Sequence, residues 1–152
     1  MTQADLDHQF MQQAIGQAQL AALAGEVPVG AVLVRDGKVI SKAFNQPINH
    51  HDPSAHAEML ALRAAAKAEE NYRLPGSTLY VTLEPCTMCA GAILHARVDR
   101  VVYGAPDPKT GAAGSVLDVF SSKQINHQTV VEGGIMGEEC GRLLRSFFKE
   151  RR

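Results

Sequence analysis

The chain has 152 residues, 45% of them hydrophobic, with 15 lysines and arginines against 16 aspartates and glutamates. This size and composition predict one compact domain over residues 1–152, and the near-zero net charge does not by itself indicate a nucleic-acid binder. No apolar run approaches the roughly 20 residues of a membrane span, and the polar first residues are unlike a signal peptide. We therefore expect a cytoplasmic protein with no membrane partner.

The first third of the chain is predicted to form a helix followed by a hairpin. Apolar residues at helical spacing predict the helix over residues 5–23. Two runs rich in β-branched residues, 29–34 and 39–44, flank the dipeptide Asp36-Gly37. Because Asp-Gly between two such runs is a strong hairpin signal, these runs should pair as antiparallel strands.

Helices and strands alternate in the remainder of the chain. Residues 45–53 are predicted to be irregular, and residues 54–68, rich in alanine and leucine, to be helical. The further expected elements are a strand at 78–83, a helix from Cys86 to about His95, a strand at 100–104, a glycine-rich loop at 107–115, a short helix near 116–120, a strand at 128–132 and a C-terminal helix from about Met136. This alternation predicts a layered α/β fold with a hairpin at one end.

Two cysteines and one histidine form a candidate metal site. Cys86 and Cys89 lie three positions apart at the start of a predicted helix, so their thiolates point the same way and can hold one metal ion, with His56 as third ligand. Three protein ligands leave one corner of a zinc tetrahedron open for a water, whose pKa zinc lowers to ~7. Glu58, two residues after His56, can lie beside that water and carry protons without binding the metal.

Other interpretations of these residues remain open. A Cys-x-x-Cys pair can be a redox pair, but that interpretation gives no role to His56 and Glu58. A structural zinc site would be closed by a fourth protein ligand, for which Cys140 is the candidate, although it lies in an apolar stripe typical of a core. Glu84, beside the motif, is either a second acid or a support for nearby loop backbone.

The motif also identifies a resemblance. His-x-Glu followed by Pro-Cys-x-x-Cys is the signature of the zinc-dependent deaminases of nucleobases, and this chain carries it as His56-Ala57-Glu58 and Pro85-Cys86-Thr87-Met88-Cys89. Beyond the signature, the chain resembles the bacterial tRNA-specific adenosine deaminases within the cytidine and deoxycytidylate deaminase superfamily. The stretches that carry this resemblance are residues 26–34, 51–58, 71–74, 80–92 and 109–115.

The resemblance implies a three-layer, cytidine deaminase-like α/β fold, with a mixed five-stranded sheet and helices on both faces. It also implies a homodimer with one Zn²⁺ per subunit that converts adenosine at wobble position 34 of an arginine tRNA to inosine and ammonia, with the tRNA anticodon stem-loop as partner. Zinc would be held by His56, Cys86 and Cys89, and Glu58 would be the catalytic proton carrier. The expected substrate contacts are Asn45 at the purine edge and Asp107, Lys109, Asn126 and Phe147 at the flanking nucleotides.

Two alternative functions remain at this point. The first is a deaminase of a free base or nucleoside such as guanine or cytidine. The second is a noncatalytic, zinc-stabilised RNA-binding module, which the basic C-terminal segment from Arg142 to Arg152 would suit.

Overall fold

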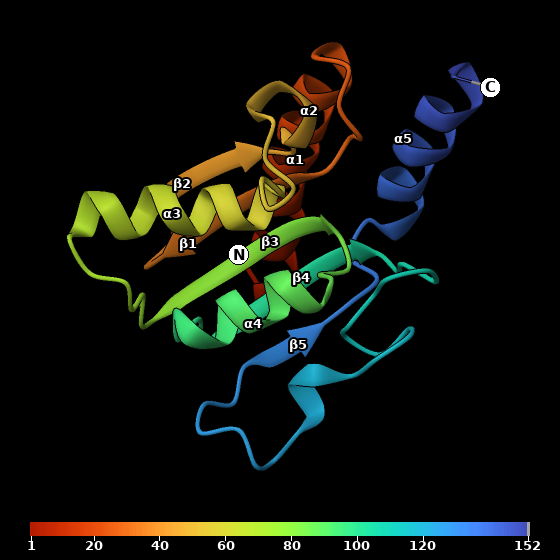
Figure 1. Cartoon of the computed structure of the whole chain (residues 1–152). Coiled ribbons are helices and arrows are strands. Elements are labelled where there is room, and N and C mark those ends of the chain that lie inside the picture. Colours follow the sequence, from red (N-terminus) through yellow and green to blue (C-terminus); the bar gives the residue numbers. More distant parts are fainter. Residues whose placement is uncertain (152) are drawn as a thin grey trace.

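The computed structural model describes residues 1–151, and its five strands form one sheet in the order β2-β1-β3-β4-β5 (Figure 1). β1 pairs antiparallel with both β2 and β3, whereas β3, β4 and β5 run parallel. The strands are β1 (Gly30–Arg35), β2 (Lys38–Phe44), β3 (Ser77–Leu83), β4 (Arg100–Ala105) and β5 (Val130–Glu132). The mixed five-stranded sheet expected for this sequence is confirmed.

Helices cover both faces of this sheet and give three layers. One face packs against α3 and α4 through a core that includes Leu79 and Val101, and the other packs against α1 and α5 through a core that includes Tyr80 and Val102. Successive strand residues thus point to opposite cores. The helices are α1 (Gln3–Leu23), α2 (Pro47–His50), α3 (Ala57–Glu69), α4 (Thr87–His95), the 3₁₀ turn η1 (Val119–Ser121) and α5 (Gly137–Glu150). Within residues 1–151, no helix has both the length and the apolar character needed to cross a membrane.

Local chemistry explains where the first elements begin and turn. Thr2 caps α1 in a reciprocal capping box with Asp5, which extends the helix two residues before its predicted start. In the β1–β2 hairpin, Asp36 and Gly37 have φ of 52° and 73°. Two positive φ angles in succession define the turn that an Asp-Gly pair favours, so the predicted hairpin is confirmed.

Three predicted elements differ from the observed ones. The stretch predicted to be irregular contains the short helix α2, the short helix expected near residues 116–120 is the 3₁₀ turn η1, and the strand expected at 128–132 is limited to β5. α2 depends on a distant residue, because the buried carboxylate of Glu26 accepts hydrogen bonds from the backbone N–H groups of Ile48 (3.2 Å) and Asn49 (2.7 Å). No local sequence signal reveals such a cap.

The ends of four strands lie together along one side of the sheet. Gly30 at the start of β1 pairs with Phe44 at the end of β2, and Leu83 at the end of β3 pairs with Ala105 at the end of β4. α3 and α4 begin beside this edge, which also carries the segment after β4 (Figure 1). The carboxyl end of a parallel strand pair, followed by a helix N-terminus, is the usual position of a site in such a sheet.

Candidate active site

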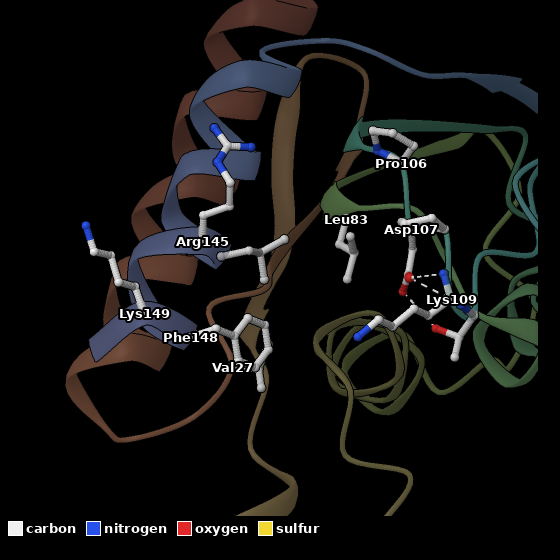
Figure 2. Close-up of a pocket in the computed structure, with 11 residues that line it drawn as sticks. Val27, Leu83, Pro106, Asp107, Lys109, Arg145, Phe148 and Lys149 are labelled. Atoms are coloured by element: carbon white, nitrogen blue, oxygen red, sulfur yellow. Dashed lines mark hydrogen bonds between the residues drawn. The ribbon is translucent and has the colours of Figure 1, made fainter. Parts of the chain in front are cut away.

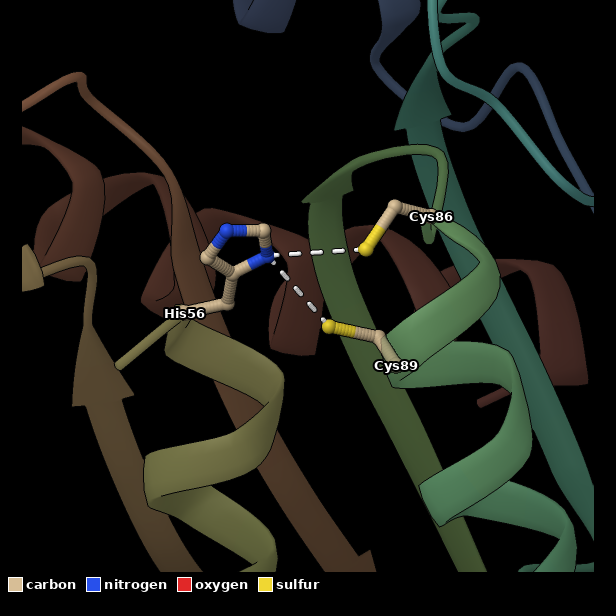
Figure 3. A group of neighbouring side chains, drawn as sticks. All are labelled: His56, Cys86 and Cys89. Carbon is tan, nitrogen blue, oxygen red and sulfur yellow. Dashed lines mark hydrogen bonds between the residues drawn. The ribbon is translucent and has the colours of Figure 1, made fainter. Parts of the chain in front are cut away.

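Three side chains that could hold a metal ion meet where α3 and α4 begin (Figure 3). His56 is the residue that caps α3, Cys86 caps α4, and Cys89 lies in the first turn of α4. Nδ1 of His56 lies 3.6 Å from the sulfur of Cys86 and 3.5 Å from the sulfur of Cys89. Among residues 1–151, these three form the one cluster of His, Cys, Asp and Glu whose ligand atoms all lie within 4.8 Å of one another.

The spacing of these donors fits zinc. In a zinc tetrahedron with Zn–N of about 2.0–2.1 Å and Zn–S of about 2.3 Å, the nitrogen and each sulfur are separated by about 3.5–3.6 Å. The observed separations of 3.5 and 3.6 Å have this value. One imidazole and two thiolates also form a donor set that zinc favours. The arrangement can therefore hold a zinc ion with three protein ligands.

The charges of the three ligands favour a cation. Hydrogen bonding with Cys89 lowers the pKa of the Cys86 thiol to about 4, although burial opposes this shift. The pKa of Cys89 is raised by its hydrogen bond with Cys86 and by burial, and the pKa of His56 is raised by its hydrogen bond with Cys86. These shifts favour the thiolate at Cys86, and binding of a metal ion would displace the proton of Cys89 and the proton that His56 gains at low pH.

The side chain of Glu58 lies next to this cluster. It is 4% exposed, and burial raises its pKa to about 7. Glu58 forms no salt bridge with any lysine or arginine in residues 1–151. Because a carboxyl group with a pKa near neutrality can both take up and release a proton, Glu58 has the properties of a general acid and base.

Within residues 1–151, no fourth His, Cys, Asp or Glu joins the cluster. Cys140 is 1% exposed, but it belongs to the core on the opposite face of the sheet, where it packs with Phe10 and Val102. Its sulfur also fills the space beside Gly104. The interpretation of Cys140 as the residue that closes a structural zinc site is therefore wrong, and the cluster keeps an open side.

A small cavity of about 200 Å³ occupies that open side. His56, Cys86 and Glu58 form one part of its wall, and Asn45, at the end of β2, forms another. The remaining lining residues are Val27, Val29, Leu83, Glu84, Asp107 and Thr110. Three apolar side chains and several polar ones thus share the wall of the cavity, a combination that can hold a heterocycle and fix its orientation.

A wider groove of about 860 Å³ adjoins the cavity and shares Val27, Leu83, Asp107 and Thr110 with it (Figure 2). It lies between α5 and the segment after β4. Figure 2 shows the ring of Phe148 on the groove side of α5, with Lys109 and Pro106 on the other side of the groove, and Arg145 and Lys149, also lining residues, on α5. An exposed aromatic ring between cationic side chains is an arrangement suited to stacking a base and contacting a phosphate.

The predicted substrate contacts fall into two groups. Asn45 and Asp107 line the cavity, and Asp107 and Lys109 line the groove. Phe147 is 7% exposed and packs under the guanidinium of Arg151 at 3.5 Å, and Asn126 is exposed in the segment between η1 and β5. Neither of these two residues lines the cavity or the groove.

The aromatic residue in the groove is Phe148, which the sequence analysis did not select. It is 45% exposed, and its ring meets the ring of Phe147 edge-on with centroids 5.5 Å apart. Helix spacing in the sequence distinguishes Phe148 from Phe147. Phe147 follows the core residue Cys140 by seven positions and so lies on the same helix face. Phe148 follows Leu144, a groove residue, by four positions.

The three-layer fold, the open His-Cys-Cys cluster and the free carboxylate together define the class of zinc-dependent hydrolytic deaminases. A family model described as the cytidine and deoxycytidylate deaminase zinc-binding region matches residues 4–105. The chain belongs to this cytidine and deoxycytidylate deaminase family.

Within this family, the chain is similar to tRNA-specific adenosine deaminases. A tRNA-specific adenosine deaminase of Haemophilus influenzae is 52% identical over 149 residues, which cover 97% of this chain and 86% of the relative. One of Bacillus subtilis is 48% identical over 152 residues, covering 100% of this chain and 92% of the relative. A solved structure from a study of A-to-I editing by tRNA:A34 deaminases has a TM-score of 0.86 and 46% identity, covering 90% of this chain and 99% of that chain.

Proposed function

We propose that this protein is a tRNA adenosine deaminase that converts adenosine to inosine at wobble position 34 of the anticodon of an arginine tRNA and releases ammonia. It acts in the cytoplasm as a homodimer with one Zn²⁺ per subunit. The observation that carries the proposal is the cavity in which the open side of the His-Cys-Cys cluster faces Glu58 and Asn45. The relatives named above act on tRNA, which supports the choice of substrate.

Glu58 carries the protons of the reaction. His56, Cys86 and Cys89 would hold a zinc ion, which would supply the Lewis acidity that activates a water for attack on C6 of adenine. Glu58 takes a proton from the attacking water and delivers it to N1 of the base, and it then moves the proton of the new C6 hydroxyl to the amine, which leaves as ammonia. Burial holds the pKa of Glu58 at about 7, so the same carboxyl group serves in both directions near neutral pH.

Asn45 orients the base. Its side chain is 8% exposed and lines the cavity together with Glu58. An amide presents both a donor and an acceptor, which matches the alternating pattern on the edge of a purine. Val27, Val29 and Leu83 supply apolar surface for the faces of the ring. Exclusion of bulk water by this surface strengthens the hydrogen bonds to the base.

The groove receives the nucleotides beside the target. A base must leave its stack to enter a cavity of about 200 Å³, which costs least in an anticodon loop, where the bases are already unpaired. Lys109, Arg145 and Lys149 provide positive charge along the groove. Asp107 contributes polar acceptors, and Asn126 and Phe147 remain proposed contacts of nucleotides farther along the loop.

Sequencing of cellular tRNA after loss of this protein tests the proposal. The expected result is adenosine at position 34 of the arginine tRNA where inosine is present in wild-type cells. Ammonia release from an anticodon stem-loop should also exceed release from free adenosine, guanine or cytidine. Unchanged inosine in the tRNA, or equal use of the free compounds, would contradict the proposed substrate.

A further inference from the structure

The proposed chemistry leaves one buried carboxylate beside the site unused. Glu84 directly follows β3, and its side chain is 2% exposed. The carboxylate accepts hydrogen bonds from the backbone N–H groups of Asp107 (3.0 Å), Ala113 (2.9 Å) and Ser115 (3.1 Å), and from the hydroxyl of Ser115. All four donors belong to residues 107–115, here called the 107–115 loop.

The backbone of the 107–115 loop is built closely around this carboxylate. A Cβ atom at Gly111 would overlap the Glu84 carboxylate, so only glycine allows the chain to pass there. The N–H of the next residue, Ala112, donates to the carbonyl oxygen of Pro85 at 2.8 Å. The loop is thus attached to the two residues that immediately precede the metal ligand Cys86.

The same loop supplies walls of both the cavity and the groove. Asp107 and Thr110 line both of them. The Asp107 carboxylate accepts from the N–H of Lys109 (3.0 Å), from the N–H of Thr110 (3.2 Å) and from the hydroxyl of Thr110 (2.7 Å). The orientation of Asp107 therefore follows from the conformation of the loop, and that conformation follows from Glu84.

We propose that Glu84 is a positioning residue for RNA recognition: its carboxylate holds the 107–115 loop in the conformation that admits the target base and the neighbouring nucleotide. The proposal rests on the proposed function and deepens it. An ionised carboxylate only accepts, so it can receive four donors at once. An amide at this position would turn an N–H group towards N–H donors, and the loop would have to move.

The kinetics of Glu84→Gln test this role. The variant should retain zinc and fold, while kcat/KM for the anticodon stem-loop should fall by roughly 10²-fold, mainly through KM, because the proposed role of Glu84 is to hold the loop and not to carry protons. The matched control is Asp7→Asn, a buried carboxylate on the other face of the sheet, which should leave KM unchanged. An unchanged KM in Glu84→Gln, or a fall in kcat alone, would overturn the proposal.

Hydrogen exchange provides a readout that does not depend on activity. In Glu84→Gln the amides of Ala113 and Ser115 should exchange faster, since their hydrogen-bond acceptor is altered, while amides in the centres of β3 and β4 should not change. Uniform acceleration over the whole chain, or no acceleration in the loop, would contradict a local positioning role.

A second variant covers the case in which Glu84→Gln fails to fold. Ser115→Ala removes one side-chain donor and should raise KM in the same direction but less, and its effect should be non-additive with that of Glu84→Gln where both can be measured. If the wild-type protein binds the stem-loop without deaminating it, the proposed function fails, while exchange and stem-loop affinity still decide the role of Glu84. Normal affinity and exchange in Ser115→Ala and Glu84→Gln would refute the positioning role alone.

Discussion

The two faces of the sheet each bury a carboxylate, and the surroundings of the two groups differ. On the α1 face, Asp7 is 1% exposed and accepts hydrogen bonds from both terminal nitrogens of Arg100 (2.8 and 2.6 Å) and from the hydroxyl of Tyr80 (2.7 Å). On the α3 face, Glu58 has no cationic partner in residues 1–151 and lines a cavity.

Because of these different surroundings, the pKa of Asp7 is lowered and the pKa of Glu58 is raised from the ordinary values of the two groups. Burial alone would raise the pKa of Asp7, but hydrogen bonds from Arg100 and Tyr80 outweigh it and hold the pKa below its ordinary value. Burial of Glu58 is only partly offset by its own backbone N–H, by His56 and by Cys89, so its pKa rises to about 7. A fully paired buried carboxylate stabilises one conformation, whereas an unpaired one beside a cavity remains able to exchange protons. We therefore expect the carboxylate on the α1 face to stabilise the fold and the carboxylate on the α3 face to take part in the reaction.

The largest effect should follow from removing a metal ligand. Cys86→Ser is expected to lose bound zinc and with it all deamination, because only two strong protein ligands remain. Cys140→Ala, on the other face, should keep zinc and lose about 1 kcal/mol of stability. Metal analysis and an inosine assay on both variants test this contrast. Loss of zinc from Cys140→Ala would contradict the prediction that Cys140, on the other face of the sheet, has no part in metal binding.

Replacing Glu58 should remove turnover without removing the metal. Glu58→Ala is expected to lower kcat by at least about 10²–10⁴-fold, since a positioned general acid and base contributes that much, while zinc content stays at the wild-type value. Rates of inosine formation at saturating stem-loop measure the effect. Retained turnover would show that another group carries the protons.

The complementary variant on the α1 face should affect stability instead. Asp7→Ala leaves Arg100 partly buried without its principal partner and should cost about 3–5 kcal/mol of unfolding free energy. The kcat of the folded fraction should not change. Urea unfolding gives the first quantity, and assays well below the unfolding transition give the second. A loss of kcat with full stability would reverse the assignment of the two faces.

The dependence of the unfolding free energy on acidic pH should differ between the wild-type protein and the variant Asp7→Asn. Because the folded pKa of Asp7 lies below the unfolded value of about 4, its contribution is fully present above that pH and is lost as the pH falls through the folded pKa. Wild-type protein should therefore lose more unfolding free energy between pH 5 and pH 3 than Asp7→Asn. Equal losses in the two proteins would mean that the pair with Arg100 is not the source of the shift.

The smallest expected effect concerns the groove. Arg145 lines it, whereas Arg142, three positions earlier on α5, lines a separate pocket between α5 and α1. Arg145→Ala should reduce the slope of log affinity for the stem-loop against log salt concentration by about 1, and Arg142→Ala should leave that slope unchanged. Titrations of a labelled stem-loop at several salt concentrations compare the two. Equal slopes would argue against RNA in this groove.

Much of the site is encoded locally and could be predicted from the sequence. His56, Cys86 and Cys89 have fixed spacings within helix starts, so their convergence requires only that two helices begin at the same edge of a sheet. The Asp36-Gly37 turn and the alternation of helices and strands are equally local signals. These features account for the mixed sheet and for the metal cluster.

The features that sequence analysis missed depend on contacts between distant segments. α2 forms because Glu26, more than twenty residues away, accepts from its backbone. Support of loop backbone was one of the two roles predicted for Glu84 and is confirmed, but the loop that it supports, residues 107–115, lies too far along the sequence to be identified from it. Helix spacing from Cys140 places Phe147 on the core face of α5, but only the packing of α5 shows that the neighbouring face, with Leu144 and Phe148, borders the groove.

The central claim is that three residues hold a zinc ion while Glu58 remains beside it unbound. X-ray absorption spectroscopy of the zinc-loaded protein tests this most directly. The account predicts two sulfur ligands, one imidazole nitrogen and one solvent oxygen, with the same coordination in Glu58→Ala. A third sulfur or a second imidazole in the coordination sphere, or a change of coordination in Glu58→Ala, would contradict it.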